Sequence, residues 1–367
     1  MGEMHTNIWR VDAEHPMPED LQEAAEGLRR GDTIAFPTET VYGLGADARN
    51  TEAVAAVFTA KGRPSDNPLI VHIADRSQLS ELTAPPEEAV SRLMDAFWPG
   101  PLTLVLPVRQ GALSPLVTAG LPTVGIRIPD HPVARSLIAA AGCPVAAPSA
   151  NRSGRPSPTE AAHVLGDLAG RIAGVVDGGP AGVGLESTVV ELRGDTLYVL
   201  RPGGVTGAEL RRALPAGVRV QDAVEAPTAT ETPRAPGMKY AHYAPRGSLT
   251  IVLGADRAAV LAYMRRELEM ARARGERTGA LLFGAAGGRQ AAEEQAAGML
   301  AAAADHIARC GSQGDLSSAA RELYGALRSF DEAEAAFIVA EGCGEEGIGA
   351  AIMNRLRKAA AGRVVTL

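Results

Sequence analysis

The sequence predicts an α/β protein with a larger domain on a twisted, mixed, open sheet, followed by a linker and a smaller α/β domain. Over residues 1–221, short apolar runs alternate with amphipathic helical patterns, as in sheets that are covered by helices. Residues 222–248 have no apolar periodicity and are rich in Pro, Ala and Thr, which is typical of a linker. Over residues 249–367, strand-like runs are separated by long Ala-rich helical patterns, as in a small Rossmann-like domain.

Local signals place the elements of both domains. Asn50 or Thr51 can cap a helix that ends at Gly62, and Thr206 with Glu209 forms a capping box for the last helix of the first domain. Apolar periodicity predicts further helices at residues 18–30, 85–97, 132–140 and 159–168. Strands are expected at residues 33–36, 69–73, 124–128 and 143–147 in the first domain and at 249–253, 279–283 and 336–340 in the second.

The composition favours a cytoplasmic enzyme. The 367 residues are 46% hydrophobic, which is enough to fill two cores. We find no apolar run of about 18 residues and no signal-peptide pattern, so we expect no membrane association. Cys143, Cys310 and Cys343 are odd in number and far apart, which favours buried thiols over disulfides or a zinc site. The net charge of −7 and the pI near 5.6 indicate that any tRNA binding is weak at most.

Polar residues gather directly after the strand expected at 33–36. Pro37 ends that strand because proline donates no ladder hydrogen bond, and Thr38, Glu39 and Thr40 follow at its tip. Hydroxyl and carboxylate groups in this position do not fill a core, and the glycines that follow let the backbone approach a ligand closely. Glu39 can either hold a metal ion or cap the loop, and the sequence favours neither.

A basic loop begins where the helix that ends at Gly62 stops. Lys61 and Arg63 lie two positions apart, a spacing of two cations that suits a polyanion such as a triphosphate. The simpler interpretation is a solvated helix end that complements the helix dipole. The composition argues against this simpler interpretation. Of the 36 Lys and Arg residues, only those at positions 61, 239 and 358 are lysines. We therefore predict that Lys61 and Arg63 are catalytic phosphate ligands.

Three further positions each allow two interpretations. Arg127 alternates with isoleucines in a predicted strand, so it either meets a carboxylate or points outward into solvent. His72 lies in the strand at 69–73, where a lone histidine is usually a core or surface residue. Residues 149–154, SANRSG, form a loop of small residues. Such a loop either offers backbone N–H groups to phosphate or adenine or is a plain surface loop.

Seven motifs in one order give the chain a family resemblance. The stretches PTETVYGLGADA and KGRPSDNPLIVHI resemble the signature of the YrdC-like family of threonylcarbamoyl-AMP synthases. WPGPLTLVL, TVGIRIPDHP, APSANRSGRPSPT, ESTVVEL and LRPGGVT follow in the expected order, and together the motifs span most of residues 20–214. The tail beyond residue 236 resembles the longer, two-domain form of the family.

The resemblance implies a YrdC-like catalytic domain and a nucleotidyltransferase. Its expected reaction converts ATP, L-threonine and bicarbonate, or CO2, to threonylcarbamoyl-AMP, pyrophosphate and water. This is the first step of threonylcarbamoyladenosine formation in tRNA, and a tRNA threonylcarbamoyl transferase would receive the adenylate. Mg²⁺ is expected with ATP, without identified protein ligands, and no organic cofactor is expected. The implied L-threonine ligands are Thr40, His72, Arg127, Ala147 and Ser187. The implied ATP ligands are Arg63, Asn67, Thr123, Ser149, Ser157, Arg201 and His242, with Lys61 on the phosphates.

The linker contains a segment with an unusual composition, residues 236–245. It holds two tyrosines, a histidine and one of the three lysines between prolines, whereas flexible tethers are rich in Gly, Ser or Pro. We predict that it closes over the nucleotide, and the alternative is that its tyrosines pack between the domains. Two other functions stay open: a non-catalytic RNA-binding or ribosome-associated module, and a carbamoyl-transfer maturation factor for hydrogenase.

Overall fold

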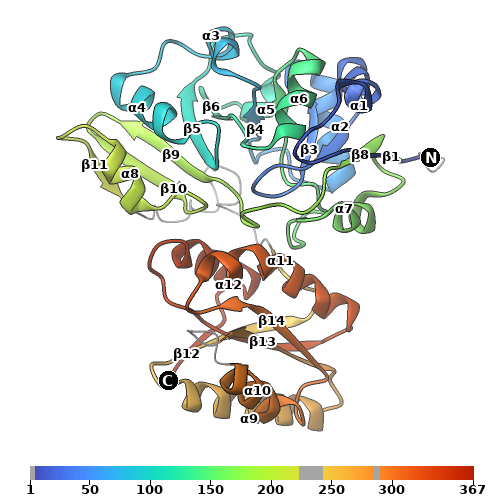
Figure 1. Cartoon of the computed structure of the whole chain (residues 1–367), viewed down its shortest axis with the longest axis vertical. Helices are drawn as coiled ribbons and strands as arrows, with labels where there is room; N and C mark the ends of the chain where they lie inside the picture. The colour runs from blue at the N-terminus through green and yellow to red at the C-terminus, as the bar shows by residue number, and fades with distance from the viewer. Residues whose placement is uncertain (1–4, 223–242, 285–289) are drawn as a thin grey trace. The chain divides into compact units, whose positions relative to one another are not determined.

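The computed structural model describes residues 5–222, 243–284 and 290–367, and Figure 1 shows them as a ribbon. The described residues form two compact units. The first contains residues 5–153 and 157–222, and the second contains the residues from 243 onwards together with residues 154–156. Within these described ranges, no helix is long and apolar enough to cross a membrane.

The first unit is built on a mixed sheet of 11 strands, which confirms the predicted fold class. The strand order is β1-β8-β2-β3-β7-β4-β6-β5-β9-β10-β11. Parallel pairs such as β4 with β6 occur beside antiparallel pairs such as β5 with β6. The strands are β1 (Asn7–Arg10), β2 (Ile34–Phe36), β3 (Gly43–Asp47), β4 (Ile70–His72), β5 (Leu102–Pro107), β6 (Thr123–Arg127), β7 (Val145–Ala146), β8 (Gly174–Asp177), β9 (Thr188–Arg193), β10 (Thr196–Arg201) and β11 (Arg219–Gln221).

The helices of the first unit follow the predicted periodicity closely. Asn50 caps α2 through its side chain, and Gly62 ends that helix in the left-handed conformation; the capping box of Thr206 and Glu209 is also present. Two predicted starts are too early. The helix expected from residue 85 begins at Glu88, because Pro86 disfavours helical backbone in the residue before it. The helix expected from residue 159 begins at Ala161. The helices are α1 (Pro18–Arg30), α2 (Thr51–Lys61), α3 (Leu79–Leu82), α4 (Glu88–Phe97), α5 (Pro115–Thr118), α6 (Pro132–Ala141), α7 (Ala161–Leu168) and α8 (Gly207–Ala213), with a 3-10 turn η1 (Arg76–Gln78).

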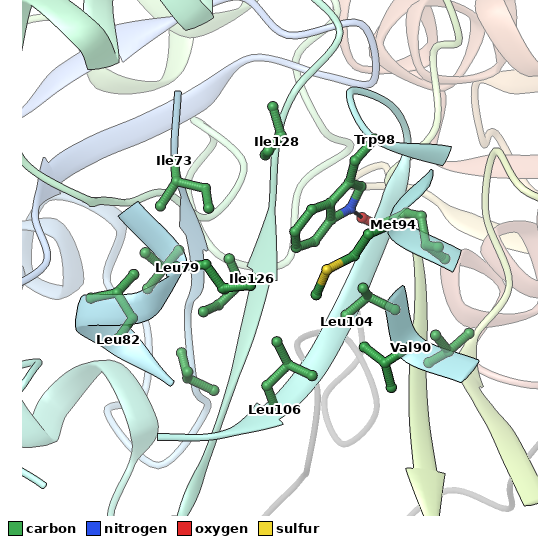
Figure 2. Packing of buried hydrophobic residues seen from close by; sticks show 14 of the residues in the cluster. Ile73, Leu79, Leu82, Val90, Met94, Trp98, Leu104, Leu106, Ile126 and Ile128 are labelled. Atoms are coloured by element: carbon green, nitrogen blue, oxygen red, sulfur yellow. Dashed lines mark hydrogen bonds between the residues drawn. The ribbon is translucent and has the colours of Figure 1, made fainter. Parts of the chain in front are cut away.

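The largest core of the first unit lies on one face of the central strands. Leu104 of β5 pairs in register with Ile126 of β6 and with Val190 of β9, and all three belong to one buried apolar cluster. Figure 2 shows how Trp98 and residues of α4 pack on these strands. Because side chains alternate across a strand, the residues between these apolar positions lie on the opposite face.

The second unit has five parallel strands in the order β14-β13-β15-β12-β16, as expected for a small Rossmann-like domain. Helices α9 and α10 lie on one side of this sheet, and α11 and α12 lie on the other (Figure 1). Within this second sheet, β14 and β16 were not expected from the sequence. The strands are β12 (Ser248–Leu253), β13 (Thr278–Gly284), β14 (His306–Ser312), β15 (Phe337–Glu341) and β16 (Val364–Thr366), and the helices are α9 (Arg257–Ala273), α10 (Gln290–Leu300), α11 (Leu316–Glu332) and α12 (Gly349–Ala359).

One prediction about a single residue needs correction in the second unit. Cys343 is only half-buried, whereas Cys143 and Cys310 are buried as expected. Tyr243, at the end of the segment predicted to cover the nucleotide, is itself buried. Its ring stacks on Tyr324 with 5.4 Å between the ring centroids. The aromatic ring of Tyr243 is therefore part of the packing of the second unit.

Candidate active site

Polar residues collect on the face of the first sheet that lies opposite the main core. His72 and Arg127 pair in register at the ends of the parallel strands β4 and β6. Their neighbours Val71 and Ile126 belong to the main apolar cluster, so alternation directs the two polar side chains to the other face. Arg127 is only 2% exposed, which excludes the interpretation of an outward, solvated strand residue.

The Arg127 guanidinium is the centre of a buried hydrogen-bond network. Its Nη1 donates to Glu39 Oε1 at 3.1 Å and to Thr40 Oγ1 at 3.0 Å, and its Nη2 lies 3.2 Å from His72 Nε2. Thr38 Oγ1 lies 2.8 Å from Thr40 Oγ1 and donates to the Val41 carbonyl. The loop after β2 therefore delivers its polar side chains to Arg127, as the run of polar residues at 38–40 suggested.

Burial determines the protonation of this network. Burial, followed by the charge of Arg127, lowers the pKa of His72 well below its usual value. Since an arginine only donates hydrogen bonds, the neutral His72 ring accepts through Nε2. Burial raises the pKa of the Glu39 carboxyl, and the adjacent Arg127 charge opposes that rise. The site thus holds one buried cation, Arg127, which pairs with the carboxyl group of Glu39.

Several buried side-chain polar atoms of the first unit have no hydrogen-bond partner among the described residues, and those of Asn67 and Arg127 are among them. Both side-chain polar atoms of Asn67, and Nε of Arg127, have no hydrogen-bond partner among the residues that the structure describes. Asn67 is 0% exposed. Buried polar groups are normally paired, so the atoms of Asn67 and Arg127 are available to hydrogen-bond a ligand.

Lys61 is buried at the end of α2, which excludes a solvated helix end. Its Nζ donates to the carbonyl oxygens of Ser149 and Asn151, the latter at 2.6 Å. Ser153 N in turn donates to the Lys61 carbonyl at 2.9 Å. Lys61 therefore holds residues 149–153 of the predicted loop against the helix, and this part of the chain is no plain surface loop. Arg63 is half-buried and donates to the carbonyl oxygens of Asn67 and Pro68.

The remaining predicted residues fall into smaller groups. Arg201, at the end of β10, donates to the carbonyl and the hydroxyl of Ser187, and Ser157 Oγ donates to Glu186 Oε1 at 2.5 Å. Ala147 N donates to the Ile70 carbonyl beside His72. Thr123 lies at the far end of β6 from Arg127, and His242 lies outside the described residues.

Comparisons with known proteins cover both units. Residues 26–203 match a family model described as Telomere recombination, and residues 205–361 match one described as Threonylcarbamoyl-AMP synthase, C-terminal domain. A threonylcarbamoyl-AMP synthase of Bacillus subtilis strain 168 is 49% identical over 99% of this chain and 100% of its own length. The chain belongs to the threonylcarbamoyl-AMP synthase family.

Further members of the threonylcarbamoyl-AMP synthase family show the same two-domain extent. The protein so named from Schizosaccharomyces pombe is 41% identical over 93% of this chain and 88% of its own. A crystal structure of Pyrococcus abyssi Sua5 complexed with L-threonine has a TM-score of 0.87 and 40% identity. It covers 99% of this chain and 100% of that one. The resemblance drawn from the motifs is thereby confirmed.

Sequence reasoning missed two polar residues beside the predicted ligands of this family member. Glu186 accepts the hydrogen bond of Ser157, and Thr103 Oγ1 lies 2.7 Å from Ser187 Oγ. The sequence contains a feature that could have indicated each of them. Glu186 directly precedes Ser187, and Thr103 is the one hydroxyl residue within the strand LTLVLP. A polar residue on one face of an apolar strand needs a partner there.

Proposed function

We propose that this chain is an L-threonylcarbamoyladenylate synthase, a nucleotidyltransferase that supplies the first intermediate of threonylcarbamoyladenosine formation in tRNA. The observation that carries the proposal is the buried guanidinium of Arg127, held beside Thr40 and His72. Identities of 41–49% to relatives of that name support it. No observation favours the RNA-binding module or the hydrogenase maturation factor over the synthase.

In the proposed threonine pocket, Arg127 binds the substrate carboxylate. A guanidinium binds a carboxylate with two parallel hydrogen bonds, and Nε of Arg127 has no partner among the described residues. The hydroxyls of Thr40 and Ser187 and the neutral ring of His72 then position the rest of the amino acid, next to the backbone of Ala147. Glu39, which pairs with Arg127, belongs to this pocket rather than to a metal site.

The proposed chemistry depends on position and charge. The amine of L-threonine takes up bicarbonate as a carbamate and releases water. A carbamate oxygen then attacks the α-phosphorus of ATP, and pyrophosphate leaves. Cations that are already in place stabilise the charge that develops on the phosphates. We assign this role to Lys61, Arg63 and Arg201, and assign nucleotide binding to Asn67, Thr123, Ser149 and Ser157.

A magnesium ion fits this proposal as a companion of ATP. Among the described residues, no group of three His, Cys, Asp or Glu side chains could hold a metal. Mg²⁺ is commonly bound by substrate phosphates and one or two carboxylates, so an ion that enters with ATP needs no such group. It would supply charge neutralisation at the phosphates.

The first test is the substrate requirement of adenylate formation. We expect the purified chain to convert ATP to an AMP adduct and pyrophosphate only when L-threonine and bicarbonate are both present, since the carbamate is the nucleophile. Mass spectrometry of the products, with serine as a second amino acid, measures this. Adduct formation that is indifferent to bicarbonate, or ADP as the only nucleotide product, would contradict the proposal. RNA retention on a filter without turnover would favour a binding module.

We further propose that residues 236–245 close over the nucleotide, with His242 at ATP. His242→Ala in the full chain is expected to raise the KM for ATP roughly ten-fold, as for a lost hydrogen bond to a charged group. ATP with threonine should also protect the chain from proteolysis near Lys239. His15→Ala, at an exposed position of the first unit, serves as the control. Cleavage at an equal rate with and without both substrates would show that the segment only connects the domains.

The adenylate is a reactive product, so a second enzyme must consume it. We propose a cytoplasmic location and a tRNA threonylcarbamoyl transferase as the receiving partner. The net charge of −7 implies that this chain itself binds tRNA weakly at most.

A further inference from the structure

Thr103 lies on the site face of the first sheet, although none of the predicted ligands includes it. It is the second residue of β5, and its neighbours Leu102 and Leu104 point into the main core. Alternation therefore turns Thr103 to the face that carries His72 and Arg127. The residue is 0% exposed, so its hydroxyl depends on protein partners.

The hydroxyl of Thr103 completes a set of hydrogen bonds around Ser187. Thr103 Oγ1 lies 2.7 Å from Ser187 Oγ. Arg201 Nη2 donates to the same Ser187 Oγ at 3.1 Å and to the Ser187 carbonyl at 2.9 Å, and Arg201 Nε donates to that carbonyl at 3.2 Å. Arg201 thus holds the backbone of Ser187, and Arg201 and Thr103 together hold its side chain.

The direction of the hydrogen bond between the two hydroxyls depends on whether Ser187 has another acceptor for its hydrogen. A hydroxyl has one hydrogen to donate and two lone pairs. Ser187 Oγ is the one hydrogen-bond partner that the described residues offer to Thr103 Oγ1, and a buried donor is normally paired. Either hydroxyl can donate in this pair. When Ser187 donates its hydrogen to a bound acceptor, Thr103 must donate to Ser187, and Thr103 and Arg201 then occupy both lone pairs of Ser187 Oγ.

Packing holds Thr103 in the rotamer that makes this bond. A Cβ built on Gly125 of the neighbouring strand would come within 3.1 Å of Thr103 Cγ2, so the methyl group packs against the open space at that glycine. A β-branched side chain has few accessible rotamers. Because its methyl group packs against Gly125, the hydroxyl of Thr103 stays directed toward Ser187.

We propose that Thr103 is a positioning residue that makes Ser187 a hydrogen-bond donor to an anionic oxygen of the amino-acid substrate. This inference rests on the proposed function, which places L-threonine at Ser187 and ATP at Arg201. The acceptor is a carboxylate or carbamate oxygen and not the substrate ammonium group, because an ammonium group only donates. The same contacts place the threonine ligand Ser187 directly against the nucleotide ligand Arg201.

The test compares two substitutions of Thr103, one that removes the hydroxyl and one that removes the methyl group. Thr103→Val keeps the shape and removes the hydroxyl, and Thr103→Ser keeps the hydroxyl. We expect Thr103→Val to raise the KM for L-threonine roughly ten-fold, the effect of one lost hydrogen bond, and to change the KM for ATP less than two-fold. Thr103→Ser should recover most of the affinity. Thr103→Ala is a second variant without the hydroxyl in case the valine variant folds poorly.

A double mutant separates positioning from a purely structural role. If Thr103 acts through Ser187, Thr103→Val should add little to the loss caused by Ser187→Ala, because the two residues act as one unit. Additive losses, or a Thr103→Val variant with a lower melting temperature but unchanged kinetics, would overturn the inference. A wild-type chain that forms no adenylate would instead overturn the proposed function, so the two failures are distinguishable.

Discussion

Arg127→Met is expected to abolish adenylate formation and to lower the free energy of unfolding by about 3–5 kcal/mol, the cost of breaking a buried ion pair by removing one partner. The substitution leaves Glu39 in a buried position without its cation. It also removes the donor that Thr40 and His72 share. Product analysis and denaturant unfolding measure the two effects separately.

A double mutant tells whether lost activity follows from lost stability. Adding Glu39→Gln to Arg127→Met removes both charges, so most of the stability should return while threonine binding stays absent. Arg92→Met is the matched control, since Arg92 pairs with Glu88 on an exposed helix face and should cost no more than about 0.5 kcal/mol. Threonine-dependent turnover in a folded Arg127→Met variant would remove Arg127 from the site.

Lys61→Ala is expected to lower kcat/KM for ATP roughly ten- to a hundred-fold, at about 1.5–3 kcal/mol for each lost charge-assisted contact. The reason is twofold. The carbonyl oxygens of Ser149 and Asn151 lose the ammonium that holds them, and the proposed phosphate site loses a cation. Steady-state kinetics with varied ATP, next to a melting curve, measure both consequences.

Lys358→Ala provides the matched comparison for Lys61. Lys358 lies on α12 of the second unit, so its loss should leave the kinetics for ATP within about two-fold of wild type, as expected away from the site. A folded Lys61→Ala variant with wild-type kinetics would show that the scarcity of lysine has no catalytic meaning at this position.

The sequence predicted the elements well where a local signal decides their extent. The apolar periodicity of residues 18–30 and the left-handed glycine at position 62 mark helix boundaries that the structure reproduces. Strand β7 is shorter than expected because Pro144 and Pro148 flank it and donate no ladder hydrogen bonds. Strand β14 was missed because its sequence, HIARCGS, is not apolar throughout, as befits the edge of a sheet.

The site residues could be nominated from motifs, but their contacts could not be predicted. Arg127 meets Glu39 across 88 positions of sequence and His72 across 55. Lys61 reaches the Asn151 carbonyl across 90 positions. No local pattern encodes such pairs, because they depend on which strands become neighbours. Burial of Arg127 and Lys61 is a property of the assembled sheet, and for that reason solvated alternatives stayed open for both residues.

The strand order also has a consequence for biosynthesis. Strand β8 lies between β1 and β2 and pairs in parallel with both of them. A ribosome adds about 5–20 residues per second, so the roughly 140 residues between β2 and β8 take on the order of ten seconds to emerge. During that interval the backbone groups of the first two strands that later face β8 have no native partner. The nascent chain therefore exposes a strand edge that an aggregating neighbour or a chaperone can recognise before the sheet is complete.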